Sequence, residues 1–282
     1  NQDLANPLVL NRFETVDYPS GDVPVYLGGG ALQFAANGNA QPLLFHNREN
    51  SLYVRTPIVL PAGVTLTISN RTFGIDFENA ISGEGGICFM SGSAGGEMTL
   101  KNPTNTYSGG TVYNTSSLGN GVQFSRLYAS VSNAFGTGPV IVNGGSLNVL
   151  SASNVRAGGI TFTGTTVQTN DFTLLGTSPL FAGYGITNPP STYANVLLSG
   201  AFNLGIYTLY LRGQDNTFGT ISGAISGTGT AALVKMDLGT WTLTGANTFT
   251  GRVTVANGTL TLGAASALAP SVPIAVSGGT FN

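Results

Sequence analysis

The 282 residues include 10 Lys and Arg and 12 Asp and Glu, so charged side chains make up only 8% of the chain and the formal net charge is −2. A nucleic-acid groove needs clustered Lys and Arg, and this composition excludes one. With 41 Gly and only two lysines for the exposed faces of helices, the composition favours an all-β, turn-rich chain, and its small net charge makes self-association easier.

Residues 1–27 differ in composition from the rest of the chain. They contain prolines at positions 7, 19 and 24 and four acidic residues within a short span. Proline cannot donate a hydrogen bond to a strand ladder, so this composition predicts an extended N-terminal arm with a few edge strands. We expect residues 28–282 to form a single body, and the arm is a candidate assembly segment.

Short strands with one buried face fill the body. Residues 28–34, 50–55 and 64–69 each alternate apolar with polar or small residues and are followed by turn residues, a pattern typical of strands. In residues 233–282 one strand follows another about every ten residues, which leaves no room for a helix between strands. No run of about 18 apolar residues is present, so we expect no membrane-spanning helix. The chain begins Asn-Gln-Asp, without Met or an apolar leader, so we expect a removed signal or a fragment.

An internal repeat relates residues 65–149 to residues 207–282. The displacement between the two copies is about 144 positions at the start and about 134 at the end. The first copy therefore carries extra residues between Tyr113 and Tyr128, which predict a protruding loop. Two adjacent prolines within residues 181–193 predict a second lateral loop between the copies.

Several short strands in each copy suit a solenoid better than two globular domains. In a parallel β-helix, successive coils stack about 4.8 Å apart and each coil buries its apolar face on the next. With roughly 20 to 25 residues per coil, the chain would form on the order of a dozen coils. The pattern thus predicts a rod about 50–60 Å long.

The longest motif runs from Gly239 as Gly-Thr-Trp-Thr-Leu-Thr-Gly-Ala-Asn-Thr-Phe-Thr-Gly and continues through Asn-Gly-Thr-Leu to Leu260. It resembles the autotransporter-associated β-strand repeat of bacterial secreted and surface proteins. The resemblance is looser in residues 81–149, where Met98 replaces the tryptophan and Lys101-Asn-Pro replaces Thr-Gly-Ala. It implies a right-handed parallel β-helix outside the cytoplasm, and it implies no catalytic residue because the shared positions are structural.

The inventory of chemically reactive residues is small. His46 is the only histidine and Cys88 the only cysteine, which excludes a multi-histidine zinc site and an internal disulfide. We interpret His46 as a polar turn residue beside Arg48 and Glu49. Cys88 lies in the apolar run Ile-Cys-Phe-Met, which favours a buried thiol.

Asp76, Glu78 and Glu84 form the only dense acidic stretch of the body. Asp76 and Glu78 are two residues apart on a predicted strand and would project from one face, as a polysaccharide-cleaving pair or a calcium site would require. The second copy has no acid in the corresponding stretch, so the repeated feature is the scaffold. We therefore predict no catalytic, cofactor or metal site.

Four tyrosines, Tyr184, Tyr193, Tyr207 and Tyr210, lie close in sequence around the Pro-Pro loop. Exposed aromatic side chains can stack on sugars or anchor a partner. Packing against the wall of the solenoid is the interpretation that we favour for them.

The sequence therefore predicts a non-enzymatic extracellular protein at the bacterial cell surface, a structural rod or fibre subunit without a cofactor. Neither terminus has a polar cap, so we expect copies of the chain to be its partners, joined end to end. The alternative is an adhesin that binds a glycan or a surface protein through loops 113–128 and 181–193. A polysaccharide-degrading enzyme that uses Asp76 and Glu78 is the third and least favoured hypothesis.

Overall fold

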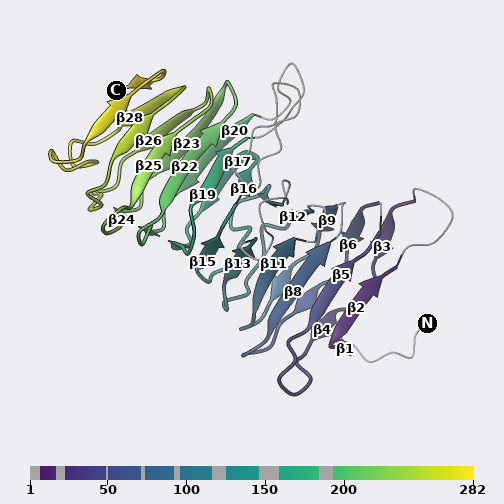
Figure 1. Ribbon diagram of the computed structural model, residues 1–282. Coiled ribbons are helices and arrows are strands. Elements are labelled where there is room, and N and C mark those ends of the chain that lie inside the picture. The colour runs from purple at the N-terminus through teal and green to yellow at the C-terminus, as the bar shows by residue number, and fades with distance from the viewer. Residues whose placement is uncertain are drawn as a thin grey trace.

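The computed structural model describes residues 7–16, 23–48, 50–70, 74–91, 96–115, 125–145, 159–183 and 193–282. Within these ranges the regular elements are strands, all strand pairs of the four sheets are parallel, and no helix could cross a membrane. The chain winds as a right-handed parallel β-helix, as the sequence predicted. Figure 1 shows the coils stacked into an elongated body with β1 and β3 at one end and β28 at the other.

Two of the four sheets end before the C-terminal end of the rod. The four-stranded sheet contains β1 (Leu8–Leu10), β4 (Leu32–Phe34), β7 (Ile58–Val59) and β10 (Ile81–Ser82). The nine-stranded sheet contains β2 (Arg12–Thr15), β5 (Leu43–His46), β8 (Thr65–Asn70), β11 (Gly86–Ser91), β13 (Thr111–Asn114), β15 (Val140–Asn143), β18 (Phe172–Leu174), β21 (Phe202–Asn203) and β24 (Ile225–Ser226).

The other two sheets reach the C-terminal end. The eleven-stranded sheet contains β3 (Val25–Leu27), β6 (Leu52–Val54), β9 (Gly74–Phe77), β12 (Glu97–Leu100), β14 (Arg126–Ala129), β16 (Gly159–Phe162), β19 (Ser178–Ala182), β22 (Thr208–Gly213), β25 (Ala232–Lys235), β27 (Val253–Val255) and β29 (Ile274–Val276). The six-stranded sheet contains β17 (Gly164–Gln168), β20 (Ala194–Leu198), β23 (Thr217–Ile221), β26 (Thr240–Leu243), β28 (Thr259–Leu262) and β30 (Thr280–Phe281).

The eleven-stranded sheet contributes one strand to each coil, close to the dozen coils that the sequence predicts. Coil length varies along the rod. Leu127 pairs with Ile160, whereas Ile160 pairs with Leu180, so a long coil is followed by a short one. Residues 116–124 and 184–192, at the centres of the two predicted lateral loops, lie outside the described residues.

One apolar core runs the length of the rod because the inward positions of each strand lie directly over those of the strand before. Leu52, Ile75 and Met98 form such a column and are buried. Aromatic rings stack in the same way. The Phe172 and Phe202 rings lie parallel, with centroids 4.7 Å apart, and Phe135 meets Phe172 edge-on.

The expected N-terminal arm is wrong for the described part of residues 1–27. Strands β1, β2 and β3 pair in parallel with β4, β5 and β6 and form the first coil. The reason is that this segment carries an apolar inward face, which packs against the core through Leu8, Leu10, Phe13, Val25 and Leu27. Pro7 and Pro24 each lie directly before a strand, and Glu14, within β2, pairs with Phe45.

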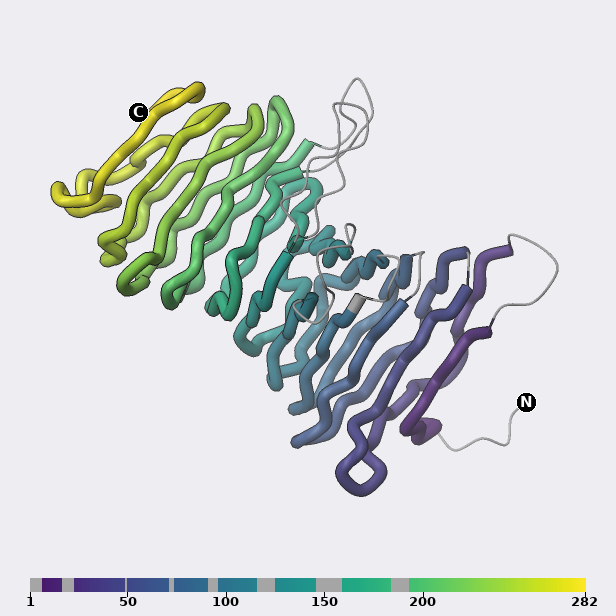
Figure 2. The backbone as a smooth tube through the Cα atoms, in the orientation of Figure 1, coloured from purple at the N-terminus to yellow at the C-terminus, as the bar shows by residue number. Residues whose placement is uncertain are grey.

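The two-residue strands belong to different sheets in the two halves of the rod. In the first half, the two-residue strands β7 and β10 belong to the four-stranded sheet. In the second half, the two-residue strands β21 and β24 end the nine-stranded sheet, and the long strands of the six-stranded sheet appear. Figure 2 shows the coils of the two halves stacked along one elongated body.

Glycines allow the closest approach between coils. A Cβ atom at Gly251 would collide with the carbonyl oxygen of Ala231 in the coil beneath. Because the obstacle is main chain, no rotamer change relieves it. At Gly28 no atom lies within 4 Å of such a Cβ.

We therefore predict that Gly251→Ala lowers the free energy of unfolding by about 1–3 kcal/mol, the usual cost of overpacking. Gly28→Ala is the matched control and should leave stability within about 0.5 kcal/mol of the unmodified chain. Chemical denaturation measures both changes. Equal stability of the two variants would contradict the close coil packing at Gly251.

Candidate functional site

Asp76 and Glu78 lie close together on the outer side of the eleven-stranded sheet, although only Asp76 is on the strand that the sequence predicted for both. Asp76 is in β9 and Glu78 follows that strand directly. Glu84 is not part of the same group, since it lies exposed in the turn between β10 and β11. The acidic stretch is thus divided between the outer side of the eleven-stranded sheet and the turn before β11.

Two cations hold the acidic pair. The Lys101 Nζ atom donates to Asp76 Oδ2 at 2.6 Å and lies 3.8 Å from Glu78 Oε1. The Arg55 Nε atom donates to Glu78 Oε2 at 2.8 Å, and this hydrogen bond raises the pKa of the exposed Arg55 guanidinium. Each carboxylate therefore has a cation from a neighbouring coil as its partner.

Tyrosines extend this group toward the N-terminal end. The Tyr26 and Tyr53 rings are stacked with centroids 5.2 Å apart, and the Arg55 guanidinium lies 4.3 Å from the centroid of Tyr26. The Lys101 Nζ atom lies 5.6 Å from the centroid of Tyr53. The ring faces are therefore occupied by each other and by cations, which leaves little platform for a sugar.

A second cluster continues the group on β12 and β14. Arg126 Nη1 donates to Glu97 Oε1 at 2.9 Å and also contacts the Tyr128 hydroxyl, whose pKa burial raises to about 12. We call the whole outer surface the charged face. It consists of Tyr26, Tyr53, Arg55, Asp76, Glu78, Glu97, Lys101, Arg126 and Tyr128.

The charged face lacks the geometry of a glycosidase or a cation site. A glycosidase needs two carboxyl groups that face a substrate across a gap, whereas Asp76 and Glu78 are engaged by Lys101 and Arg55. A calcium ion would need the position between the carboxylates that the Lys101 ammonium takes. The described residues contain no cluster of three or more His, Cys, Asp or Glu that could hold a metal ion.

His46 corrects a prediction. It is fully buried in β5, where its Nδ1 atom lies 2.7 Å from Thr15 Oγ1 and its Nε2 atom bonds the main-chain oxygen of Asn50. The turn assignment is wrong because His46 is the last residue of β5 and pairs with Thr15 in β2. Both ring nitrogens are engaged, so His46 fastens the first two coils.

Cys88 is half-buried and not fully buried as predicted. It lies on the outer side of β11, because Ile87 and Phe89 take the inward positions. Burial raises the pKa of the thiol and so disfavours the reactive thiolate.

The tyrosines around the Pro-Pro loop separate in the structure. Tyr207 packs against the core, and Tyr210 lies half-buried on the outer side of β22. Tyr193 is 56% exposed, which differs from the packing that we favoured for all four. Tyr184 lies outside the described residues.

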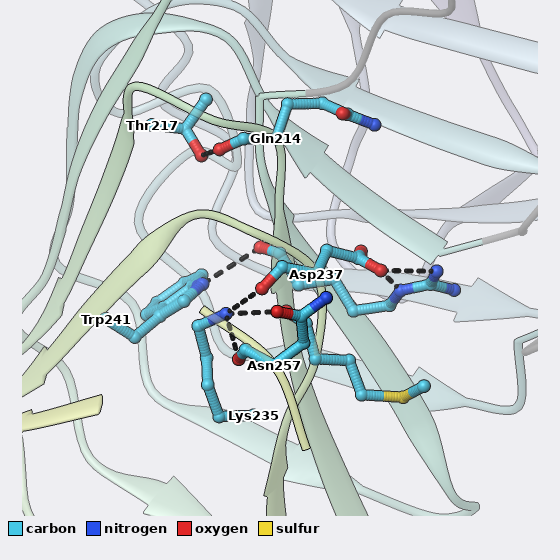
Figure 3. A network of polar contacts seen from close by, with 8 residues as sticks. Gln214, Thr217, Lys235, Asp237, Trp241 and Asn257 are labelled. Atoms are coloured by element: carbon cyan, nitrogen blue, oxygen red, sulfur yellow. Dashed lines mark hydrogen bonds and ion pairs between the residues drawn. The ribbon is translucent and has the colours of Figure 1, made fainter. Parts of the chain in front are cut away.

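A buried polar network joins three coils near the C-terminal end, and sequence reasoning missed it (Figure 3). Arg212 is 1% exposed and donates to both carboxylate oxygens of Asp237, with Nε at 2.8 Å and Nη2 at 3.1 Å. The indole Nε1 of Trp241 donates to the main-chain oxygen of Arg212 at 2.9 Å. The motif tryptophan thus anchors the corner that carries the ion pair.

Lys235 is the centre of this network. It is fully buried, and its Nζ atom donates to the main-chain oxygens of Met236, Asp237 and Asn257 at 2.6, 2.7 and 3.2 Å. Asp237 has a φ of 59°, a left-handed conformation uncommon for a residue with a side chain. Burial lowers the pKa of Lys235 from 10.5 to about 8, and nearby Asp237 opposes this shift. A lysine inside the apolar strand Leu-Val-Lys was the available sequence signal.

Two asparagines make the same hydrogen bonds in the two repeat copies. Asn105 Oδ1 accepts from Ile81 N at 2.9 Å, and its Nδ2 donates to Ala134 O at 2.8 Å. Asn247 Oδ1 accepts from Ile225 N at 2.7 Å, and its Nδ2 donates to Ala267 O at 2.6 Å. Each side chain therefore links the coil below to the coil above.

The chain matches the model of one protein family, the passenger-associated-transport-repeat, over residues 95–112 and 233–262. The resemblance predicted from the sequence is thereby confirmed. The first segment contains Asn105, and the second contains Lys235, Trp241 and Asn247. Together with the parallel β-helix, these matches fit a passenger-like protein of an autotransporter. Neither the curated proteins nor the solved structures contain a match.

We predict that Asn247→Ala lowers the free energy of unfolding by about 2–3 kcal/mol, because Ile225 N and Ala267 O would each be left buried without a partner. Asn105→Ala should cost a similar amount for the same reason. Asn195→Ala, on the exposed side of β20, is the matched control. A loss at Asn247 no larger than that of the control would show that the bridge is dispensable.

The pH dependence of stability follows from Lys235. Between about pH 8 and 10.5 the unfolded chain keeps the Lys235 proton while the folded chain has released it. Unfolding then takes up a proton, so the free energy of unfolding rises with pH across this window, by at most ~1.4 kcal/mol per pH unit.

Chemical denaturation at several pH values, compared with Lys235→Met, measures this slope. Tyrosine ionisation contributes equally to both proteins and cancels in the difference. We expect the difference to change across the window and to level off above it. A difference that is constant with pH would contradict the lowered pKa.

Proposed function

We propose that this chain, which carries two passenger-associated-transport repeats, is an extracellular structural rod of the bacterial cell surface and not an enzyme. The observation that carries the proposal is the continuity of core and ladder through eleven strands of one sheet. The residues of the repeat motif, Lys235, Trp241 and Asn247, each make a hydrogen bond to another coil. These three side chains are buried and hold neighbouring coils together, so they present no reactive group to solvent.

The location outside the cytoplasm is supported by the repeat family. The chain has few charged residues and many Ser, Thr and Asn side chains. Such a surface is polar, yet charge repulsion between adjacent rods would be weak. The charged face contributes to the same role, since its ion pairs join neighbouring coils.

End-to-end assembly is the finer part of the proposal. Ile274 and Val276 in β29 continue the inward columns of Val253 and Val255, yet they are 45% and 52% exposed. At the opposite end of the same sheet, β3 presents inward Val25 and pairs on only one side within the described residues. A second copy whose β3 lies over β29 would continue the eleven-stranded sheet and cover these side chains.

Electron microscopy of the purified chain tests this assembly. We expect filaments whose length grows with protein concentration, and we expect Ile274→Asp with Val276→Asp to leave isolated rods because the charges would enter the joined core. Ala275→Asp, which points outward between them, is the control and should still give filaments. Isolated rods from the unmodified chain at every concentration would overturn the assembly but leave the rod itself.

The adhesin hypothesis has no observation in its favour, because the centres of loops 113–128 and 181–193 lie outside the described residues. The enzyme hypothesis depends on Asp76 and Glu78, whose partners are Lys101 and Arg55. An assay of the unmodified chain on polysaccharides is expected to show no cleavage. Cleavage that Asp76→Asn abolished would refute the structural proposal.

A further inference from the structure

The outer side of the six-stranded sheet carries two straight ranks of side chains. Register places the residues of each rank directly over one another, one per coil. The first rank is Thr165, Asn195, Phe218, Thr240, Thr259 and Thr280. The second rank is Val167, Leu197, Thr220, Thr242 and Thr261.

None of these eleven side chains is charged, and we call this surface the neutral face. It contrasts with the charged face, where the outer positions of β9, β12 and β14 carry paired acids and cations. A rod that only needed solubility would carry charge on every side. The neutral face can therefore be buried against a partner without removing a charge from water.

Large apolar side chains gather at the N-terminal half of the neutral face and at its edge. Phe218 is 45% exposed and Val167 is 37% exposed. At the corner beside them, Tyr193 and Leu238 are 56% and 57% exposed. Clustered exposed apolar groups of this size are typical of contact surfaces.

The spacing of the ranks favours another β-helix as the occupant. Each rank repeats once per coil, at about 4.8 Å. A second copy of this chain has the same spacing between coils. Each rank would therefore meet a rank of equal spacing over the whole neutral face. Two neutral faces also bring no like charges together, whereas an acidic or basic partner would find no counter-charge here.

We propose that the neutral face docks side by side against the neutral face of a second copy. A two-fold axis parallel to the rods places each coil opposite its own equivalent. The coils with Val167, Leu197 and Phe218 then meet apolar coils, and the threonine coils meet threonine coils. The contact is lateral and independent of the rod ends, so it stands apart from end-to-end assembly.

Sedimentation velocity over a range of concentrations tests the pairing. The unmodified chain is expected to form dimers, and Thr220→Lys with Thr242→Lys is expected to weaken dimerisation at least ten-fold by facing like charges across the contact. The matched control is Thr67→Lys with Thr173→Lys, two outward threonines of the nine-stranded sheet. This control should dimerise like the unmodified chain.

A charge-swap experiment separates docking from an effect on folding. Thr220→Glu with Thr242→Glu alone should also be monomeric, and mixing it with the lysine variant should restore a dimer. A failure of the mixture to associate would overturn the proposal, as would a monomeric unmodified chain or equal weakening by the control. A monomer that binds ice or a crystalline polysaccharide through the neutral face would equally overturn it.

Electron microscopy distinguishes this contact from end-to-end assembly. Lateral pairs should be wider than single rods but of the same length. They should persist in the double variant Ile274→Asp with Val276→Asp. Loss of length with retained pairs would refute only the end contact. Loss of pairs with retained filaments would refute only the lateral one.

Discussion

The parallel hydrogen-bond ladder between coils is the interaction on which the rest of this structure depends. Strand β11 shows it most fully, since it pairs along its whole length with β8 below and through Ile87–Met90 with β13 above. Where no strand forms, an asparagine amide takes over the role of a backbone amide. Asn105 and Asn247 do so at equivalent turns, so the ladder continues through corners that would otherwise leave buried groups unpaired.

The pairing between coils also determines which partners the charged residues of the chain find. Charges that face outward on the eleven-stranded sheet lie one coil apart and pair with each other, as Lys101 does with Asp76. Charges that the fold buries are paired or capped by carbonyl groups, as Arg212 and Lys235 are. The six-stranded sheet has neither kind on its outer side. The rod thus has chemically different sides although one winding pattern produces all of them.

The fold class and the stacked repeat could be predicted from alternation, turn residues and the internal repeat. The sheet that a motif occupies could not be predicted. Asn105 bonds a strand of the four-stranded sheet, whereas Asn247 bonds a strand of the nine-stranded sheet, because the coils between them differ in length. The turn predicted at His46 and the arm predicted for residues 1–27 were wrong for a similar reason. Polar residues in the sequence indicated turns and loops, but the pairing of β2 with β5 makes these segments strands. The partners of Asp76 and Glu78 come from other coils, which sequence spacing does not reveal.

The orientation of the ladder has a mechanical consequence. Hydrogen bonds between coils run along the rod, so a pull on its two ends loads them one coil at a time and not all together in shear. The weakest coil boundary then sets the force at which the rod begins to unravel. Side chains that tie a coil to both of its neighbours, as Asn247 does, make the peeling of that coil break a bond on each side.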